Sequence, residues 1–597
     1  MTSKILALAI AASVAGSVQA GDIEFVNAPI PTTDLEKRSV LTSQFAIIDG
    51  EKVDVEYNTL LRSGDEPKGS WAPFGQLHDI EGQPIIAEDG SVRVSNDNDF
   101  TSIVRGKNGR LFMVSHFESR PAAMYLTKLR QNKKTGELKA VKTRPLDFSH
   151  VNGGWVHCAG SVTPWGNHLG SEEYPPNGLQ WEEGNTISSY NAQMVQYFPE
   201  ARGAADADLP ELARDYMNPY DYGFVTEVSV KNFHKADVVK HYSMGRVAIE
   251  LAYVMPNEKT VYISDDGGKV GLFRYEADKK GDLTSGNLYV AKWNQTSTWY
   301  PVKTNVEAEF RDGGSANIEW IHLGHATDDE IRDIIDSGIT FNDIFEVDGD
   351  SCTTVTTRDG TDCLTVKPGM DKAAAFLESS RYGALMGGTL EFEKMEGITH
   401  DPDSNTMYLA MSRVRSAMTD GEGDISVPHN YCGTVYGLDL DNDYTAYNMY
   451  GVVNGIPRTV SRGAVVDNPY PAPYTQNSCD LNGISEPDNV TFMPGYKTLI
   501  IGEDTGDTRH QNDIIWAYNV ETEELARVQT TPYGSETTSP YFYPNINGFA
   551  YMTSVIQHPF GESDQDALLV PEEARGYTGY IGPFPAMGEG DDKPFWK

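Results

Sequence analysis

This 597-residue chain has few basic residues, and the shortage excludes several classes of partner. Lys and Arg number 48 against 86 Asp and Glu, so the formal net charge is −38. A charge of this sign repels nucleic acids and anionic lipid surfaces. We therefore expect no nucleic-acid partner and no stable membrane association. An anionic substrate would need metal ions or a few local Lys and Arg side chains to offset the repulsion by the negatively charged protein.

The sequence also lacks an apolar run long enough to cross a bilayer. The apolar stretch at residues 5–14 is too short to span one, and so are the later runs. It follows Lys4 and precedes a small-residue cleavage site at 18–20, which is typical of a Sec-type signal peptide. No twin arginine precedes it and no lipobox cysteine follows it. We expect residues 1–20 to be a signal peptide and the mature protein to be periplasmic or extracellular.

Cysteine is scarce, and the count is odd. Of the five cysteines, Cys352 and Cys363 bracket a Thr- and Asp-rich segment, whereas Cys432 and Cys479 are placed to close a longer loop. Four cysteines allow three connectivities, and this pairing is the economical one because it leaves Cys158 out. An unpaired thiol in an exported protein is oxidised unless it is protected, so a buried metal ion becomes a candidate partner for Cys158.

Short β-branched and aromatic runs recur along the chain, separated by Gly, Asp, Asn and Pro clusters. Turn segments at 255–259, 401–405 and 493–497 share one form, and each precedes an apolar strand. Such a repeated pattern of turns and strands is typical of β-propeller blades. The predicted strands are 110–115, 223–230, 259–264, 270–275, 287–292, 405–410, 433–438, 497–501 and 513–519.

Helical patterns are confined to a few short segments, at 207–216, 328–337 and 371–380. A chain of this length needs repeated sheets, and its strands alternate with turns rather than with long amphipathic helices. We therefore expect an all-β propeller that forms one domain over residues 21–597. Loop and short helical insertions near 175–220 and 300–380 interrupt it.

Polar clusters lie beside the predicted strands, and together they predict a metal site. Loops from different blades meet around the central channel of a propeller. Each cluster alone is typical of a turn or a solvated strand end. Together, a thiolate with carboxylates describes a transition-metal site, and carboxylates with Asn carbonyls describe a calcium site. The clusters are 96–100, 115–118, Cys158 with Glu172 and Glu173, 245–250, 264–266, 393–396 and 486–489.

One run resembles the signature of the PhoX-type alkaline phosphatases. It reads Cys158-Ala-Gly-Ser-Val-Thr-Pro-Trp-Gly-Asn-His-Leu-Gly-Ser-Glu-Glu173, and the family has Cys-Ala-Gly-x-x-Thr-Pro-Trp-Gly-Thr-Trp-Leu followed by Cys-Glu-Glu. The resemblance extends through much of the mature chain in the family's order. The other similar segments are 98–100, 114–116, 224–228, 244–250, 263–266, 286–292, 486–489 and 556–559.

The resemblance implies a phosphomonoesterase on a six-bladed propeller, with ferric iron (Fe3+) and calcium (Ca2+) at one axial site. By residue-to-residue transfer, Cys158 would be the thiolate ligand of iron, Glu250 an iron-site carboxylate and Glu396 a further metal ligand. In two pairs of adjacent residues, either member could be the calcium ligand. The calcium ligands would be Asp265 or Asp266, Glu172 or Glu173, Asp488 and Asn489.

Lys394 and Arg413 are the candidates to bind phosphate through charge-assisted hydrogen bonds. The family's Arg-Pro-Glu is Lys394-Met395-Glu396 here, so a point charge replaces a planar bidentate donor. Ser171 replaces the family's second cysteine, and the family's twin arginines are missing. These departures indicate a divergent member.

The leading interpretation is an exported monomeric phosphomonoesterase that acts on small-molecule phosphate esters. A calcium-only propeller hydrolase of the phytase or lactonase kind remains an alternative, and so does a non-catalytic binding propeller stabilised by calcium. A serine or cysteine nucleophile ranks below these. The chain has no Gly-x-Ser-x-Gly elbow between a strand and a helix, and the neighbours His157 and Cys158 would point to opposite faces of a strand.

Overall fold

A computed structural model describes residues 21–588 apart from 185–186, 299–312, 458–459, 462–463, 466–476 and 507–508. The expected signal peptide, residues 1–20, lies outside the described residues. The last nine residues of the expected single domain do so too, and that domain boundary stays a prediction.

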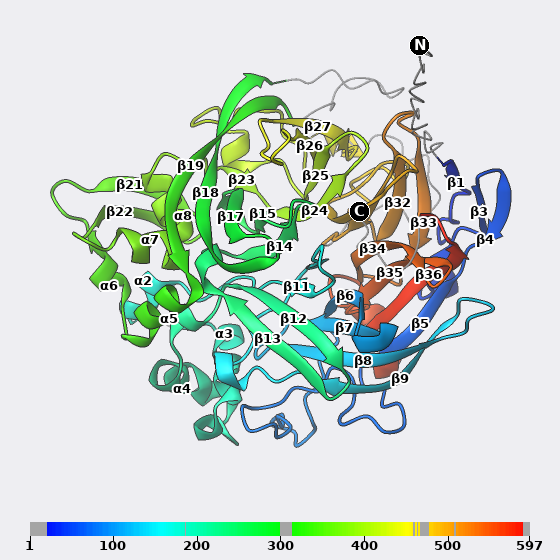
Figure 1. Ribbon diagram of the computed structural model, residues 1–597, viewed down its shortest axis with the longest axis horizontal. Helices are drawn as coiled ribbons and strands as arrows, with labels where there is room; N and C mark the ends of the chain where they lie inside the picture. The colour runs from blue at the N-terminus through cyan, green and yellow to red at the C-terminus, as the bar shows by residue number, and fades with distance from the viewer. Residues whose placement is uncertain are drawn as a thin grey trace, which may run out of the picture.

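Antiparallel sheets arranged around a common centre make up most of the described chain (Figure 1). Two four-stranded sheets come first in sequence. The first consists of β6 (Asn98–Arg105), β7 (Leu111–Phe117), β8 (Ala123–Gln131) and β9 (Leu138–Pro145). The second consists of β10 (Ser161–Val162), β11 (His168–Gly170), β12 (Val225–Asn232) and β13 (Lys235–His241).

The next two units are joined edge to edge in one nine-stranded sheet, because β19 pairs with β27. One half consists of β14 (Ile249–Val254), β15 (Thr260–Asp265), β17 (Phe273–Lys279), β18 (Asp282–Ser297) and β19 (Ser315–Thr327). The other half consists of β24 (Met395–Asp401), β25 (Thr406–Met411), β26 (Thr434–Asp439) and β27 (Asn448–Asn454).

N-terminal strands complete the last two units. The fifth consists of β30 (Pro487–Met493), β31 (Thr498–Glu503), β32 (Ile514–Asn519), β33 (Leu525–Thr530) and the added β2 (Leu41–Thr42). The sixth consists of β34 (Glu536–Ile546), β35 (Phe549–Gln557), β36 (Tyr577–Pro585) and the added β5 (Tyr57–Arg62). Segments from the two ends of the described chain therefore share these sheets.

The first strands of the six units form a closed ring around the centre. In the described chain β6 contacts β10, and the contacts continue through β14, β24, β30 and β34 back to β6. Each unit is thus one blade of a six-bladed propeller. This arrangement confirms the predicted all-β propeller.

Several smaller sheets are separate from the six blades. The small sheets contain β1 (Ile23–Phe25), β3 (Phe45–Ile48) and β4 (Glu51–Asp54); β16 (Gly268–Val270) and β23 (Phe392–Glu393); β20 (Phe345–Val347), β21 (Thr353–Thr357) and β22 (Gly360–Val366); and β28 (Val460–Ser461) and β29 (Ala464–Val465). The helices are α1 (Asp34–Lys37), α2 (Gly178–Glu182), α3 (Ser189–Ala192), α4 (Leu209–Tyr216), α5 (Asp328–Asp336), α6 (Phe341–Ile344), α7 (Asp371–Leu377) and α8 (Ser379–Leu385). All but α1 gather on one side of the propeller (Figure 1).

Local sequence explains the helix boundaries. Thr327 and Glu330 form a capping box at the start of α5, because each side chain accepts the other residue's backbone N–H. Ile331 and Ile335 are buried on one face of that helix. The predicted helix at 371–380 is two helices, because Glu378 leaves the helical region with φ −131° and ψ 49°.

One predicted strand is also divided. Residues 270–275 belong to β16 and β17, since Val270 pairs with Phe392 of β23 while β17 begins at Phe273. Gly271 lies between them, and a Cβ there would come within 2.8 Å of Leu390. The two strands pair with different partners, since β16 pairs with β23 and β17 with β15. The other predicted strands and helices all overlap observed ones.

The apolar core is divided among the interfaces between blades. At one interface, Tyr408 and Ala410 of the fourth blade pack with Leu499, Ile501 and other buried residues of the fifth. Full burial of a Leu or Ile side chain stabilises the fold by about 2 kcal/mol. The packing of such faces therefore holds the blades in a ring.

Both predicted disulfides, Cys352–Cys363 and Cys432–Cys479, are present, and Cys158 is a buried free thiol. In the described part of the chain, none of the helices combines the length and the apolar character that a membrane span requires.

Candidate metal centre

The first strand of every blade brings an acidic or thiol side chain to the centre of the ring. Five of these are carboxylates within β6, β14, β24, β30 and β34, and the sixth is a cysteine three residues before β10. All are buried except Glu536, which is partly exposed. In blade order they are Asp99, Cys158, Glu250, Glu396, Asp488 and Glu536.

Four of these carboxylates occupy the same structural position, the first residue of a β-bulge. In β14, for example, Glu250 and Leu251 together oppose Ser264, because Ile249 pairs with Asp265 and Ala252 with Ile263. The same two-against-one irregularity occurs at Asp99, Glu396 and Asp488. A bulge bends its strand and redirects a side chain. The repeated bulge is the backbone feature that the four carboxylates share.

A second set of carboxylates forms adjacent acidic pairs at or just after the end of the second strand of three blades. The first member of each pair satisfies backbone donors. Glu172 accepts hydrogen bonds from the N–H groups of Trp155, Gly223 and Phe224 at 3.0 to 3.2 Å, and it pairs with Lys240 at 2.9 Å. Glu172 therefore holds loops together.

Asp265 and Glu503 have the same structural role in their blades. Asp265 accepts from the N–H of Ala248 at 3.0 Å. Glu503 accepts from the indole N–H of Trp516 at 2.6 Å and from the backbone N–H of Ser485 at 2.9 Å.

The second member of each pair faces the centre. Glu173, Asp266 and Asp504 line a cavity of about 450 Å3. Successive side chains of an extended chain point to opposite sides, which explains the division of roles within each pair. The same cavity is lined by Cys158 and Glu250, and by Asp97, Glu118, Tyr174, Tyr190, Lys394, Glu396, Asp488, Glu536, Gln557, His558, Gly561 and Glu562.

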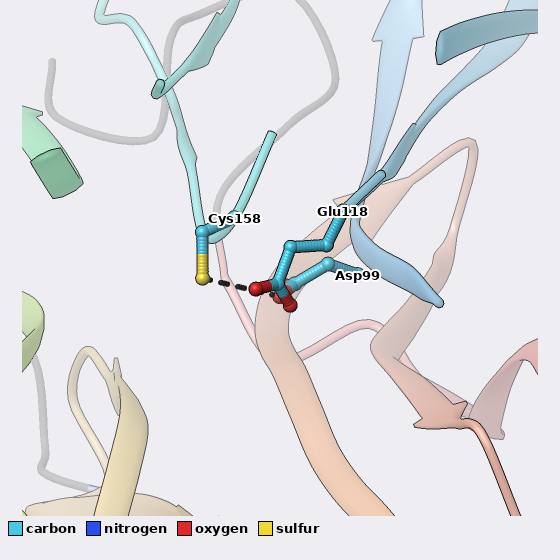
Figure 2. Close-up of side chains that lie close together, drawn as sticks. All are labelled: Asp99, Glu118 and Cys158. Carbon is cyan, nitrogen blue, oxygen red and sulfur yellow. Dashed lines mark hydrogen bonds between the residues drawn. The ribbon is translucent and has the colours of Figure 1, made fainter. Parts of the chain in front are cut away.

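Cys158 lies among the carboxylates. Its Sγ donates to Glu250 Oε2 at 3.0 Å and to Asp99 Oδ2 at 3.4 Å. Figure 2 shows the thiol pointing toward Asp99, with the Glu118 carboxylate beside it. Burial, and then the charges of Glu250 and Asp99, raise the pKa of this thiol well above its ordinary value. A bound cation would reverse this effect, because it favours the thiolate.

Three overlapping groups of side chains bring ligand atoms within 4.8 Å of one another. Cys158 belongs to the first and second groups, and Glu250 to the second and third. The centre therefore offers a row of adjacent cation positions. The groups are Asp99, Glu118 and Cys158; Cys158, Glu173 and Glu250; and Glu250, Asp266 and Glu396.

The electrostatics of the cavity fit bound cations. Burial and neighbouring carboxylates raise the pKa values of Glu250, Asp488 and Glu173 well above their ordinary range, and burial and Asp266 raise that of Glu396 to about 8. Asp266 Oδ1 and Asp488 Oδ2 are buried and have no hydrogen-bond partner among the described residues. A thiol with carboxylates suits a transition metal, and carboxylates alone suit calcium. The residues present therefore fit both kinds of ion.

Lys394 carries a positive charge into this acidic cavity. Its Nζ lies 3.2 Å from Glu396 Oε1 and 3.6 Å from both Asp266 Oδ2 and Asp504 Oδ2. Burial lowers its pKa, but the attraction of Asp266 and Glu396 outweighs this and raises the pKa above the ordinary value. Its φ of 49° is in the left-handed region, which is strained for a side chain of this kind. The surrounding carboxylates thus hold the ammonium group in place.

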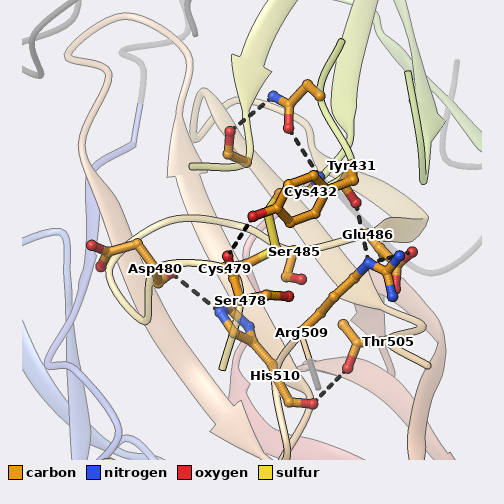
Figure 3. The surroundings of a disulfide bond; sticks show 12 residues. Tyr431, Cys432, Ser478, Cys479, Asp480, Ser485, Glu486, Thr505, Arg509 and His510 are labelled. Carbon is orange, nitrogen blue, oxygen red and sulfur yellow. Dashed lines mark hydrogen bonds and ion pairs between the residues drawn. A yellow bond between two sulfur atoms is a disulfide. The ribbon is translucent and has the colours of Figure 1, made fainter. Parts of the chain in front are cut away.

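Arg413 lies outside the residues that line the cavity. Its Nε bonds the buried carboxylate of Glu486, which Arg509 also contacts at 3.0 Å. The Cys432–Cys479 disulfide lies beside Arg509 and Glu486 (Figure 3), and the Glu486 N–H donates to the carbonyl of Cys432. The two arginines therefore hold a carboxylate near the disulfide.

The family model described as alkaline phosphatase PhoX matches residues 84–559. The chain belongs to the PhoX alkaline phosphatase family. This confirms the resemblance seen in the motifs and makes the protein a metal-dependent hydrolase of phosphate monoesters. No curated protein matches the sequence.

A solved structure supports the propeller fold. The structure of Pseudomonas fluorescens PhoX in complex with vanadate, a transition state analogue, is 16% identical with a TM-score of 0.59, and the match covers 94% of this chain and 98% of that one. A periplasmic gluconolactonase from Pseudomonas aeruginosa, PpgL, is 10% identical with a TM-score of 0.29, covering 81% and 98%.

Only some of the metal ligands predicted from the family motifs line the cavity. Six of the predicted metal ligands line it: Cys158, Glu173, Glu250, Asp266, Glu396 and Asp488. Three do not: Glu172, Asp265 and Asn489. Of the two predicted phosphate-binding residues, Lys394 lines the cavity and Arg413 does not.

Five further side chains lie at the centre and were not predicted as ligands: Asp99, Glu118, Asp504, Glu536 and His558. Asp99 and Glu118 belong to the predicted polar clusters 96–100 and 115–118, and His558 belongs to the similar segment 556–559, whereas Asp504 and Glu536 were not selected at all. The signal for Asp504 was available, because Ile501-Gly-Glu-Asp504 repeats the form of Ile263-Ser-Asp-Asp266. His558 lies 3.5 Å from Glu536, which pairs with Gln557 across β34 and β35. Only this register places Glu536 at the centre.

Proposed function

We propose that the protein is an exported phosphomonoesterase with iron(III) and calcium ions at the propeller centre, and that it hydrolyses small-molecule phosphate esters as a monomer. The observation that carries the proposal is the convergence of one thiol and many carboxylates, from all six blades, on one cavity. Export is supported by the two disulfides, which form in oxidising compartments.

We assign the iron ligands to the region around the thiol. Cys158 would ligate as a thiolate, with Glu250 and Asp99 as carboxylate ligands, because both already contact the sulfur. We assign calcium to other carboxylates that line the cavity. Glu173 and Asp266 are preferred over their sequence neighbours because they line the cavity, and Glu396 and Asp488 complete that set.

Cations bound here would polarise the phosphoryl oxygens and offset the negative charge of substrate and site. The protein's own contribution to phosphate binding comes from Lys394. It is the one Lys or Arg among the described residues that line the cavity, so it is placed to donate to a phosphoryl oxygen. We propose Lys394 rather than Arg413 for this role, since Arg413 bonds Glu486.

Two alternatives lose support. A non-catalytic propeller is disfavoured because the chain belongs to a phosphatase family. A calcium-only hydrolase does not account for Cys158, since a thiol is a poor ligand for calcium and a good one for iron. The position of the thiol therefore favours a mixed centre.

Hydrolysis of para-nitrophenyl phosphate at alkaline pH tests the proposal. The purified protein should be active, and both chelation and Cys158→Ala should abolish the activity. Glu319→Gln removes a carboxylate from an exposed position on β19 and serves as the control. A metal-loaded protein that hydrolyses no member of a phosphoester panel would overturn the proposal.

A further inference from the structure

We propose that the cavity contains a separate subsite, formed by Tyr190, that binds the planar aromatic leaving group of a phosphate ester. This subsite would select among esters that the metal centre hydrolyses, so the inference rests on the proposed function. Tyr190 lines the same cavity as Lys394 and the candidate metal ligands.

Tyr190 is the outer layer of a stack of four side chains that runs from the protein interior to the cavity. The Arg120 guanidinium carbon lies 4.0 Å from the Tyr190 ring centre and 4.9 Å from that of Trp155. The Trp155 and Tyr222 ring centres are 5.1 Å apart, with 32° between their planes. We call these four residues the Tyr190 stack.

The inner layers are buried and the outer layer is open. Arg120 is 3% exposed, Trp155 and Tyr222 are 0% exposed, and Tyr190 is 52% exposed. Arg120 Nε and Nη1 have no hydrogen-bond partner among the described residues, so contact with the two rings, rather than hydrogen bonds from these atoms, fixes the guanidinium. Tyr190 is thus a preformed aromatic surface with a rigid support, and little order is lost when a ligand stacks on it.

The rest of the cavity explains why this surface discriminates. Most of the lining side chains are carboxylates, which offer no stacking surface to an uncharged group. Tyr174 and His558 are the other aromatic residues of the lining. The Tyr174 hydroxyl is engaged by Asp266, and the His558 ring lies 3.5 Å from the Glu536 carboxylate. Aromatic stacking strengthens binding about two- to tenfold beyond simple burial. Tyr190 therefore favours planar aromatic leaving groups over saturated ones of the same size.

The origin of Tyr190 in the fold is consistent with a specificity role. It belongs to α3, outside the ring of blades, whereas the candidate metal ligands lie on or next to the first two strands of the blades. Residues on connecting segments vary substrate choice without disturbing a site built on the scaffold.

Phenyl phosphate and cyclohexyl phosphate provide the test, because they are alike in size and differ in planarity. The quantity compared is kcat/KM for phenyl phosphate divided by kcat/KM for cyclohexyl phosphate. The value for each variant is taken relative to that of the unmodified enzyme, so that the different reactivities of the two esters cancel. Tyr190→Ala and Tyr190→Leu should each lower this ratio about fivefold, and Tyr190→Phe should keep it within about twofold. Tyr447→Ala is the matched control, because Tyr447 is 53% exposed and lies away from the cavity.

Binding of phenylphosphonate and cyclohexylphosphonate, which cannot be hydrolysed, separates this inference from the proposed function. Tyr190→Leu should weaken the phenyl compound selectively. If the unmodified protein hydrolyses neither ester, the proposed function fails. The comparison of phenylphosphonate and cyclohexylphosphonate binding still tests whether Tyr190 forms an aromatic subsite. An unchanged ratio together with unchanged phosphonate selectivity in the folded Tyr190→Leu variant would overturn the inference.

Discussion

The thiol of Cys158 lies 3.0 Å from a carboxylate oxygen of Glu250, although 92 residues separate the two in sequence. Cys158 precedes the inner strand of the second blade, and Glu250 occupies the bulge of the third. The ring of blades therefore creates the contact, and no single segment of the chain contains it. A metal centre assembled in this way depends on the whole propeller being closed.

The Glu250→Gln substitution should lower the activity of the metal-loaded protein and raise the melting temperature of the metal-free protein. Gln keeps the volume of the side chain and removes its charge. Activity should fall about 100-fold or more, as expected when a metal ligand is lost. The metal-free variant should melt at a higher temperature than the metal-free unmodified protein, because burial and the neighbouring Glu396 and Asp488 make the Glu250 carboxyl group destabilising when no cation is bound, and Gln removes that group. Hydrolysis of para-nitrophenyl phosphate measures the first effect and calorimetry in the presence of chelator measures the second, and Glu319→Gln should show neither.

Lys394→Arg should retain phosphate binding, and Lys394→Met should lose it. Met keeps the length of the side chain without its charge, so KM for a phosphate ester should rise about tenfold or more. Arg restores the family residue and offers two parallel donors. Inhibition by inorganic phosphate gives an independent measure of the same site. Equal KM values for the Met and Arg variants would show that Lys394 does not bind phosphate.

The buried His241 should make stability depend on pH. Burial lowers its pKa, but hydrogen bonds to Asp328 at 3.0 Å and Glu227 at 2.9 Å outweigh burial and raise it to about 9. The folded protein thus holds a proton that the unfolded chain releases near its ordinary pKa of about 6.5. The stabilisation is complete below that pH and is lost as pH rises through about 9, which amounts to about 3 kcal/mol.

Urea unfolding at a series of pH values checks this. The unmodified protein should lose stability relative to His241→Gln as pH rises from about 6 to about 10. The exposed His322→Gln serves as the control and should follow the unmodified protein. A stability difference that does not change with pH would contradict the assignment.

The two disulfides should differ in their contribution to stability. They join residues separated by 11 and 47 positions, Cys352–Cys363 and Cys432–Cys479 respectively. Loop-closure entropy predicts about 3 kcal/mol for the shorter and about 4 kcal/mol for the longer. Pairs of Cys→Ser substitutions, compared by urea unfolding, measure both values.

Loss of the longer bridge should also reduce activity, because the Cys432 carbonyl accepts from the N–H of Glu486, two residues before the cavity residue Asp488. Equal unfolding free energies and unchanged activity in both double variants would contradict this prediction.

Much of the fold was predictable from sequence, because a strand's chemistry is local. The β-branched runs fell within observed strands, and the repeated turn segments before 260, 406 and 498 marked the entry to β15, β25 and β31. The divided segment at Val270 was not predictable, since Val270 pairs with Phe392, which is distant in sequence.

The site was less predictable, because register and bulges decide which side chain faces the centre. Alternation showed that only one member of a pair such as Asp265-Asp266 faces the cavity, but not which one. Arg413 was plausible by charge, yet Glu486 engages it. Glu536 stands in an ordinary polar context, and only its pairing with Gln557 brings it to the cavity.

Elemental analysis of the protein purified from its native compartment tests the central claim most directly. We expect both iron and calcium in the unmodified protein, and we expect Cys158→Ala to lose iron while keeping calcium, because the carboxylates that suit calcium remain. Calcium without iron in the active unmodified protein would contradict the account, and so would full iron content in the Cys158→Ala variant.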